Sequence, residues 1–150
     1  MKTFIIAAAC FLGYSAAQGS IEKDAEWTVS GLSASSLPGP QGSLTTHYSF
    51  TVTTSTQSAQ CDATSNQTGA PLGSLPETAC DPDTFSFSWT PKGDAGSDGA
   101  TLEIWDSVTE QFATHDIPAD EIHQQPEFVL GSHPYVYNGP SDFIVETQLD

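Results

Sequence analysis

The chain has 150 residues, enough for one domain, and carries 3 Lys+Arg against 19 Asp+Glu, for a formal net charge of −16. A surface this anionic repels phosphate backbones and anionic lipid headgroups, which argues against nucleic-acid and membrane partners. Enzymes that hold phosphate groups are disfavoured too, since the sequence has no Arg and no Gly-rich turn entering a helix. Hydrophobic residues make up 37% of the chain, which is sufficient for a folded core.

The first 17 residues have the three parts of a secretory signal peptide. Residues 1–3 are a short basic segment, residues 4–14 are apolar, and small residues precede Gln18 at the cleavage position. The apolar part, at about eleven residues, is too short to span a hydrocarbon core of roughly 30 Å. We therefore expect cleavage before Gln18, a secreted protein, and a single domain over residues 18–150.

Two cysteines remain once the signal peptide is removed, because Cys10 lies in its apolar part. In an oxidising compartment Cys61 and Cys80 are expected to form a disulfide, and the alternative is two free thiols. Closing a loop of about 20 residues would stabilise the fold by roughly 3 kcal/mol. No Cys-x-x-Cys pair or neighbouring His offers further ligands, so we expect neither a metal nor a cofactor.

Period-two alternation dominates the regular parts of the sequence. In residues 48–53 and 85–89 the apolar side chains fall on every second position, which is typical of a strand with one buried face. Five other short segments are rich in Thr, aromatic or β-branched residues and are separated by turn residues. In chain order the predicted strands are 27–29, 48–53, 85–89, 102–105, 111–114, 127–130 and 143–145.

The segments between these strands read as loops and turns. We expect loops over residues 33–43, 63–76 and 92–99, and a tight hairpin turn at Asp106-Ser107. The best helical fragment, residues 118–123, allows one or two turns at most. Many short strands with regular turns predict an all-β fold, a single compact antiparallel β-barrel or sandwich.

One modification site and one recognition surface can be proposed from the residues. Asn66 begins an Asn-Gln-Thr sequon, which predicts N-glycosylation there, although an ordinary polar loop is the alternative. Trp105 is out of phase with its apolar neighbours and should project from the opposite face of its strand. Together with Tyr135 and Tyr137 it is a candidate surface for a protein partner, a glycan or a small aromatic ligand.

No motif selects a catalytic residue. The sequence lacks a Gly-x-Ser-x-Gly elbow, and its four His residues show no metal-ligand spacing. Paired carboxylates for glycoside hydrolysis depend on tertiary proximity, so an acidic hydrolase remains the least favoured hypothesis. We expect a protein that is not an enzyme.

Five features follow one another in a recognisable order: Trp27-x-Val29, residues 47–52, Cys61 with Cys80, residues 85–89 and residues 138–143. Their order resembles the fungal Alternaria major allergen-like (AA1-like) family over roughly Glu26 to Gln148. The resemblance implies a compact β-barrel and a secreted allergen, elicitor or effector without a catalytic site, whose partner is an extracellular, plant defence-type host protein.

The sequence also departs from the family pattern. Cys61 and Cys80 match the family's first disulfide pair, but the second pair is absent, with Val145 near the place of one member. The N-terminal cysteine that joins two chains is missing as well. A covalent dimer is therefore not expected, while a non-covalent oligomer stays open. We expect a non-enzymatic extracellular binding protein; the alternative is a module that binds a glycan or small aromatic ligand.

Overall fold

The computed structural model describes residues 26–39, 43–66, 71–126 and 133–149. Strands dominate this part of the chain, and the two helical segments are single turns of 3₁₀ helix, η2 (Asp94–Gly96) and η3 (Ala119–Glu121). The predicted all-β class is therefore confirmed. The strands are β1 (Glu26–Pro38), β2 (Leu44–Thr53), β3 (Ser58–Ser65), β4 (Leu75–Ala79), β5 (Phe85–Pro91), β6 (Ala100–Asp106), β7 (Gln111–Ile117), β8 (Ile122–Gln124), β9 (Tyr135–Tyr137) and β10 (Phe143–Leu149).

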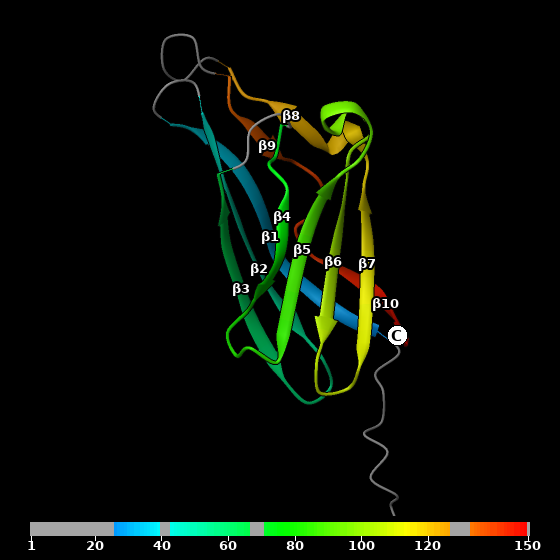
Figure 1. Ribbon diagram of the computed structural model, residues 1–150. Coiled ribbons are helices and arrows are strands. Elements are labelled where there is room, and N and C mark those ends of the chain that lie inside the picture. The colour runs from blue at the N-terminus through cyan, green and yellow to red at the C-terminus, as the bar shows by residue number, and fades with distance from the viewer. Residues whose placement is uncertain (1–25, 40–42, 67–70, 127–132, 150) are drawn as a thin grey trace, which may run out of the picture.

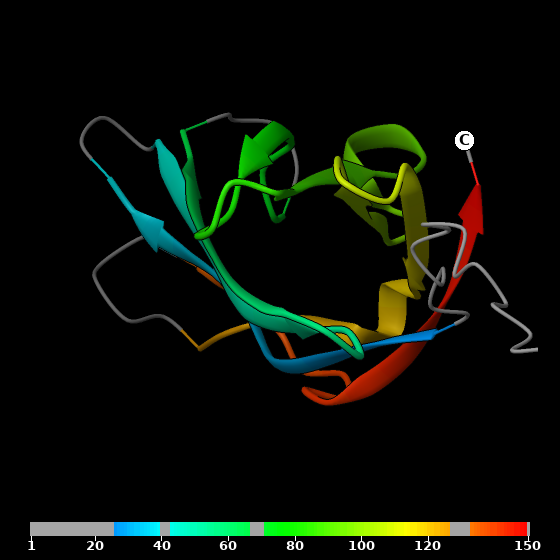
Figure 2. The same ribbon diagram turned by 90° about the horizontal axis from the view of Figure 1, so that it is seen from below.

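These strands form one antiparallel sheet that curls into a barrel (Figures 1 and 2). The order across the sheet is β3-β2-β1-β10-β7-β6-β5-β4, and the short β8–β9 pair attaches to β1. Most neighbours are hairpin partners in the sequence, but β10 returns from the C-terminus to lie between β1 and β7. Short loops and right-handed strand twist favour this kind of closure.

The two edges of the sheet, β3 and β4, meet along a line that we call the seam. Gln60 and Asp81 exchange two backbone hydrogen bonds across it, each of 2.8 Å from N to O. Next to this bridge a disulfide joins Cys61 to Cys80, as the sequence predicts. The barrel is therefore nearly closed, with the edge of β3 tied at Gln60 to the segment that follows β4.

Aromatic side chains fill the interior of the barrel. Phe50 on β2 packs edge-to-face on Phe87 of β5, with ring centroids 5.0 Å apart. Trp27 meets Phe85 edge-to-face in the same way, and Tyr48 packs on Trp89. All of these rings are at most 2% exposed, so the alternating positions of 48–53 and 85–89 do face the core.

The predicted loop over residues 33–43 is wrong in its first half. β1 continues to Pro38 and pairs with β2 as far as Leu44, after a shift in register next to Gly31. Gly31 has a φ of +67°, a conformation that glycine adopts without strain and that places a bulge in the strand. Beyond the bulge the buried side chains of β1 are Leu32, Ala34 and Ser36. Ala34 and Ser36 are small, so they add little to the hydrophobic pattern by which a strand is recognised in a sequence.

The predicted two-residue turn at Asp106-Ser107 is also wrong, since β6 includes Asp106 and four residues separate it from β7. Residues 118–123 form only η3 and the start of β8. The predicted strand 127–130 and the signal peptide 1–17 lie outside the described residues. Within the described ranges, no helix has the length and apolar character that crossing a membrane requires.

Candidate binding groove

Trp105 lies on the outer face of the barrel. Along β6 the side chains of Leu102 and Ile104 are buried in the core, while the intervening positions are partly exposed. Trp105 is one of these, and its neighbours across the sheet are Ser86 on β5 and Phe112 on β7. An indole of this size is rarely left at a solvent boundary without a packing partner, so its surroundings are the first place to seek a site.

A groove of about 410 Å³ runs beside Trp105 at the end of the barrel formed by the β6–β7 turn. β4, β5, the end of β6 and the turn into β7 build its walls. Its volume lies near the lower end of the range for ligand pockets, about 300–1,000 Å³, which suits one side chain or one sugar ring. The lining residues are Glu77, Ser86, Trp105, Asp106, Ser107, Glu110 and Gln111.

The side of the groove nearest β4 is held by a hydrogen bond between two lining residues. The Ser86 hydroxyl Oγ donates to Oε1 of Glu77 over 2.7 Å. Ser86 itself pairs directly with Trp105 in the β5–β6 register. The Glu77 carboxylate is thereby fixed on the same outer face as the indole, while the residue stays exposed to solvent.

The opposite side is built by the turn, which a buried carboxylate organises. Asp106 is 2% exposed, and its Oδ1 accepts the backbone N–H groups of Val108 (2.8 Å) and Thr109 (3.3 Å). Its Oδ2 accepts a third bond from Nε2 of Gln57. Several donors of this kind hold a buried carboxylate in place. Glu110 then leaves the turn exposed, with a φ of +55°.

The charge around Trp105 is negative without local compensation. Glu77, Asp106 and Glu110 line the groove, and none of the described residues that line it is basic. Lys92 is the only Lys or Arg in the described part of the chain, and its Nζ lies 3.2 Å from a carboxylate oxygen of Asp116. Lys92 directly follows β5 and Asp116 is near the end of β7, so this pair lies at the end of the barrel opposite the β6–β7 turn (Figure 1).

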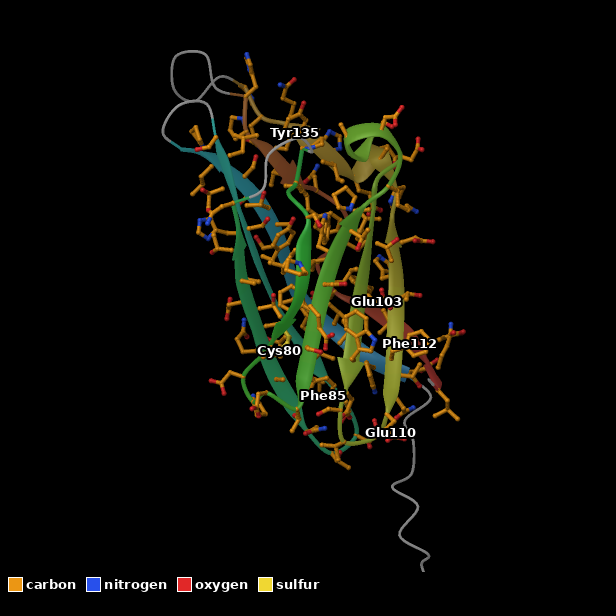
Figure 3. The ribbon with its side chains drawn as sticks, viewed as in Figure 1. Cys80, Phe85, Glu103, Glu110, Phe112 and Tyr135 are labelled. Carbon is orange, nitrogen blue, oxygen red and sulfur yellow. A yellow bond between two sulfur atoms is a disulfide. The ribbon has the colours of Figure 1, made fainter. Side chains whose placement is uncertain are left out.

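The two candidate tyrosines lie elsewhere. Figure 3 places Tyr135 at the opposite end of the barrel from Glu110. Tyr135 is half-buried and lines a second groove, of about 290 Å³, with residues 35–38, Gln125, Pro134 and Val136. Tyr137 is buried, and its hydroxyl donates to the Pro140 carbonyl over 2.8 Å; burial, with the charge of Glu121, raises its pKa to about 12. The structure therefore does not bring Trp105, Tyr135 and Tyr137 together.

Asn66 follows the last residue of β3 and is exposed. Its side-chain oxygen accepts a hydrogen bond from the Thr45 hydroxyl at 3.2 Å. An exposed asparagine meets the accessibility requirement of glycosylation. The other two residues of the sequon lie outside the described ranges.

Sequence reasoning missed Glu77, Ser86 and Glu110 as groove residues. Local sequence does not mark Glu77 and Ser86, which reach Trp105 through the pairing of β4 with β5 and of β5 with β6. Glu110 reaches the groove through the turn between β6 and β7. No group of three or more His, Cys, Asp or Glu suited to a metal ion is found among the residues that the structure describes.

Comparison with protein-family models, with curated proteins and with solved structures finds no significant match to this chain. The buried disulfide is compatible with a protein that passes through an oxidising compartment. The chemistry of the groove is therefore the best available guide to function.

Proposed function

We propose that this is a secreted, non-enzymatic protein that acts outside the cell by binding a host or environmental partner. The Trp105 groove carries the proposal. It combines a partly exposed indole, fixed carboxylates and a turn braced by the buried Asp106. Rigid aromatic side chains bordered by polar groups are the usual anchors of protein recognition surfaces.

The extracellular setting rests on two further observations. Residues 1–17 have the pattern of a signal peptide, and the Cys61–Cys80 disulfide is chemistry that persists in oxidising compartments. The resemblance to the AA1-like family belongs to the same proposal, in which the protein serves as an elicitor or effector, or an allergen-like protein, and its partner is an extracellular host protein.

A glycan ligand is the second candidate. The observation in its favour is that Trp105 and Phe112 are directly opposed on the outer face of β6 and β7. Aromatic side chains on neighbouring strands provide apolar area against which a sugar ring can pack. Ser86 and Glu77, at the edge of the groove, would then supply hydrogen-bonding groups to its hydroxyls.

Capture from extracellular fluid tests the proposal. The mature protein, residues 18–150, would be immobilised as wild type, as Trp105→Ala and as Ile144→Ala, and exposed to plant apoplastic fluid and to a glycan array. Ile144 is a matched control, because it is a large apolar residue, 61% exposed, that does not line the groove. We expect wild type and Ile144→Ala to retain the same protein and Trp105→Ala to lose it. Equal retention by all three would contradict the proposal.

A further inference from the structure

We propose that the Trp105 groove binds a positively charged side chain, an arginine or a lysine presented by a basic segment of a protein partner. This inference rests on the proposed function as a binding protein and names the chemistry of the partner. It follows from three properties of the groove: its charge, its aromatic wall and its size.

The charge favours a cation. Glu77 and Glu110 are exposed at the two sides of the groove, and the described residues place no cation in it. Loss of the signal peptide would remove Lys2 and no acid, so the mature chain is one unit more negative than the −16 of the full chain. Such a field attracts basic partners and repels acidic ones over distances of about 10 Å at 0.1 M salt.

The aromatic wall supplies the second half of a cation site. The face of an indole attracts ammonium and guanidinium groups more strongly than any other side-chain ring, and such contacts are worth about 0.5–2 kcal/mol. Trp105 is partly exposed and lies between the carboxylate of Glu77 and the turn that carries Glu110. A guanidinium can therefore stack on the ring while its edge N–H groups donate to a carboxylate, a combination that suits arginine best.

The size and polarity of the groove disfavour aliphatic and neutral ligands. A volume of about 410 Å³ admits one long side chain with its flanking backbone. An aliphatic ligand would remove carboxylates from water without pairing them, which is costly. A neutral sugar would use the ring and the hydroxyls of Ser86 and Ser107 but would gain nothing from the charge. Only a cationic group uses both features.

The test compares two peptides that differ in charge alone. Both have blocked termini and a Gly/Ser backbone; one carries two arginines, and the other carries citrulline, which keeps the shape without the charge. Binding is followed by NMR through the indole N–H signals of the three tryptophans. Since Trp27 and Trp89 are buried in the core, a ligand in the groove should move the Trp105 signal selectively.

We expect the arginine peptide to move the Trp105 signal saturably and the citrulline peptide to bind about tenfold more weakly or not at all. Glu77→Gln and Glu110→Gln should each weaken binding of the arginine peptide several-fold. Glu26→Gln is the matched control, because it removes the same charge from an exposed position at the start of β1, outside the groove. It should leave the affinity unchanged.

Each other outcome overturns the cationic site. Equal binding of the two peptides would show that charge does not select the ligand. Binding of neither peptide would show that the groove does not bind a cationic side chain. An equal effect of Glu26→Gln and Glu110→Gln would assign the attraction to the net charge of the protein. Tighter binding of a neutral oligosaccharide such as chitotriose would assign the groove to a glycan. If capture of a partner still depended on Trp105 in these cases, the proposed function would stand and only the cationic assignment would fall.

Discussion

Cys61 on β3 and Cys80, the residue after β4, are bonded across the seam where the two edges of the sheet meet. Within the described ranges, the backbone bridge that joins these two edges is the one between their neighbours, Gln60 and Asp81. The rest of the sheet is held by strand pairing, whereas this line is held by that bridge, by the disulfide and, at the end of β3, by the hydrogen bond that the Ser65 hydroxyl donates to the Ser74 carbonyl. The disulfide therefore contributes to the closure of the barrel beside β4, the strand that carries Glu77 and that also pairs with β5.

Removal of this disulfide should destabilise the protein. For the double variant Cys61→Ala/Cys80→Ala we expect a loss of about 2–4 kcal/mol in the free energy of unfolding, because the unfolded chain regains the entropy of an open loop. Urea denaturation of the variant and the wild type measures it. Mass spectrometry of the secreted wild type should also show two hydrogens fewer than the reduced form. Alkylation of both cysteines without reductant would contradict the account.

Alternate side chains of β5 face the core, and this gives a second prediction. Phe87 is fully buried and packs edge-to-face on Phe50, so Phe87→Ala should cost about 3–5 kcal/mol as a large-to-small core change. Thr51 lies on the other face of β2, and its hydroxyl bond to Gln60 is exposed. Thr51→Ala should therefore cost less than about 1 kcal/mol. Similar losses in the two variants, measured by urea denaturation, would mean that the assignment of faces is wrong.

Two glycines with positive φ should respond differently to the same substitution. A Cβ on Gly99 (φ +91°) would lie 2.0 Å from the carbonyl oxygen of Ile117, whereas a Cβ on Gly31 (φ +67°) would meet nothing within 4 Å. Gly31→Ala should cost about 1–2 kcal/mol, the conformational penalty alone. Gly99→Ala adds a backbone clash and should lower the melting temperature further. Equal melting temperatures would refute the close approach of Gly99 to the end of β7.

His115 should make stability depend on pH below neutrality. Its ring stacks on Phe143 with centroids 3.9 Å apart, and burial lowers its pKa below the usual 6.5, although the charges of Glu121 and Asp116 act in the opposite direction. Above pH 6.5 both folded and unfolded states hold a neutral ring, so stability is unaffected. As the pH falls below 6.5 the unfolded state takes up the proton first, and the folded state loses stability until its own lower pKa is reached.

The control for this effect is His115→Leu. The difference in unfolding free energy between wild type and variant, measured by urea denaturation at pH 7.5 and pH 5, removes the contribution of the other titrating groups. We expect the wild type to lose stability relative to the variant at pH 5. A relative gain at pH 5 would show that the neighbouring carboxylates outweigh burial.

The sequence was informative where side chains alternate strongly and uninformative where contacts are made by small or distant residues. The buried positions of β2 and β5 follow from the spacing of large aromatics, and the disulfide follows from a lone pair of cysteines. The second half of β1 was missed because Ala34 and Ser36 face the core without a hydrophobic signal. Glu77 approaches Trp105 only through the pairing of β4 with β5 and of β5 with β6, which no local pattern encodes.

Tyr135 is a second example of a residue whose position in the fold the local sequence does not reveal. Its aromatic character made it a reasonable partner for Trp105, but the position of β9 against β1 places it at the far end of the barrel (Figure 3). A sequence gives the chemistry of a side chain and its phase along a strand. It does not give the end of the barrel at which that strand terminates.

The most direct test of the central claim, that the Trp105 groove is the recognition surface, is the capture comparison between Trp105→Ala and Ile144→Ala in plant apoplastic fluid. Both variants remove a large apolar side chain from the outer face of the sheet. Because Trp105 is more buried than Ile144, the unfolding transition of each variant is measured first, and capture is compared at a temperature at which both are folded. We expect Ile144→Ala to retain the partner bound by the wild type and Trp105→Ala to release it. Retention of that partner by Trp105→Ala at the wild-type level would contradict it.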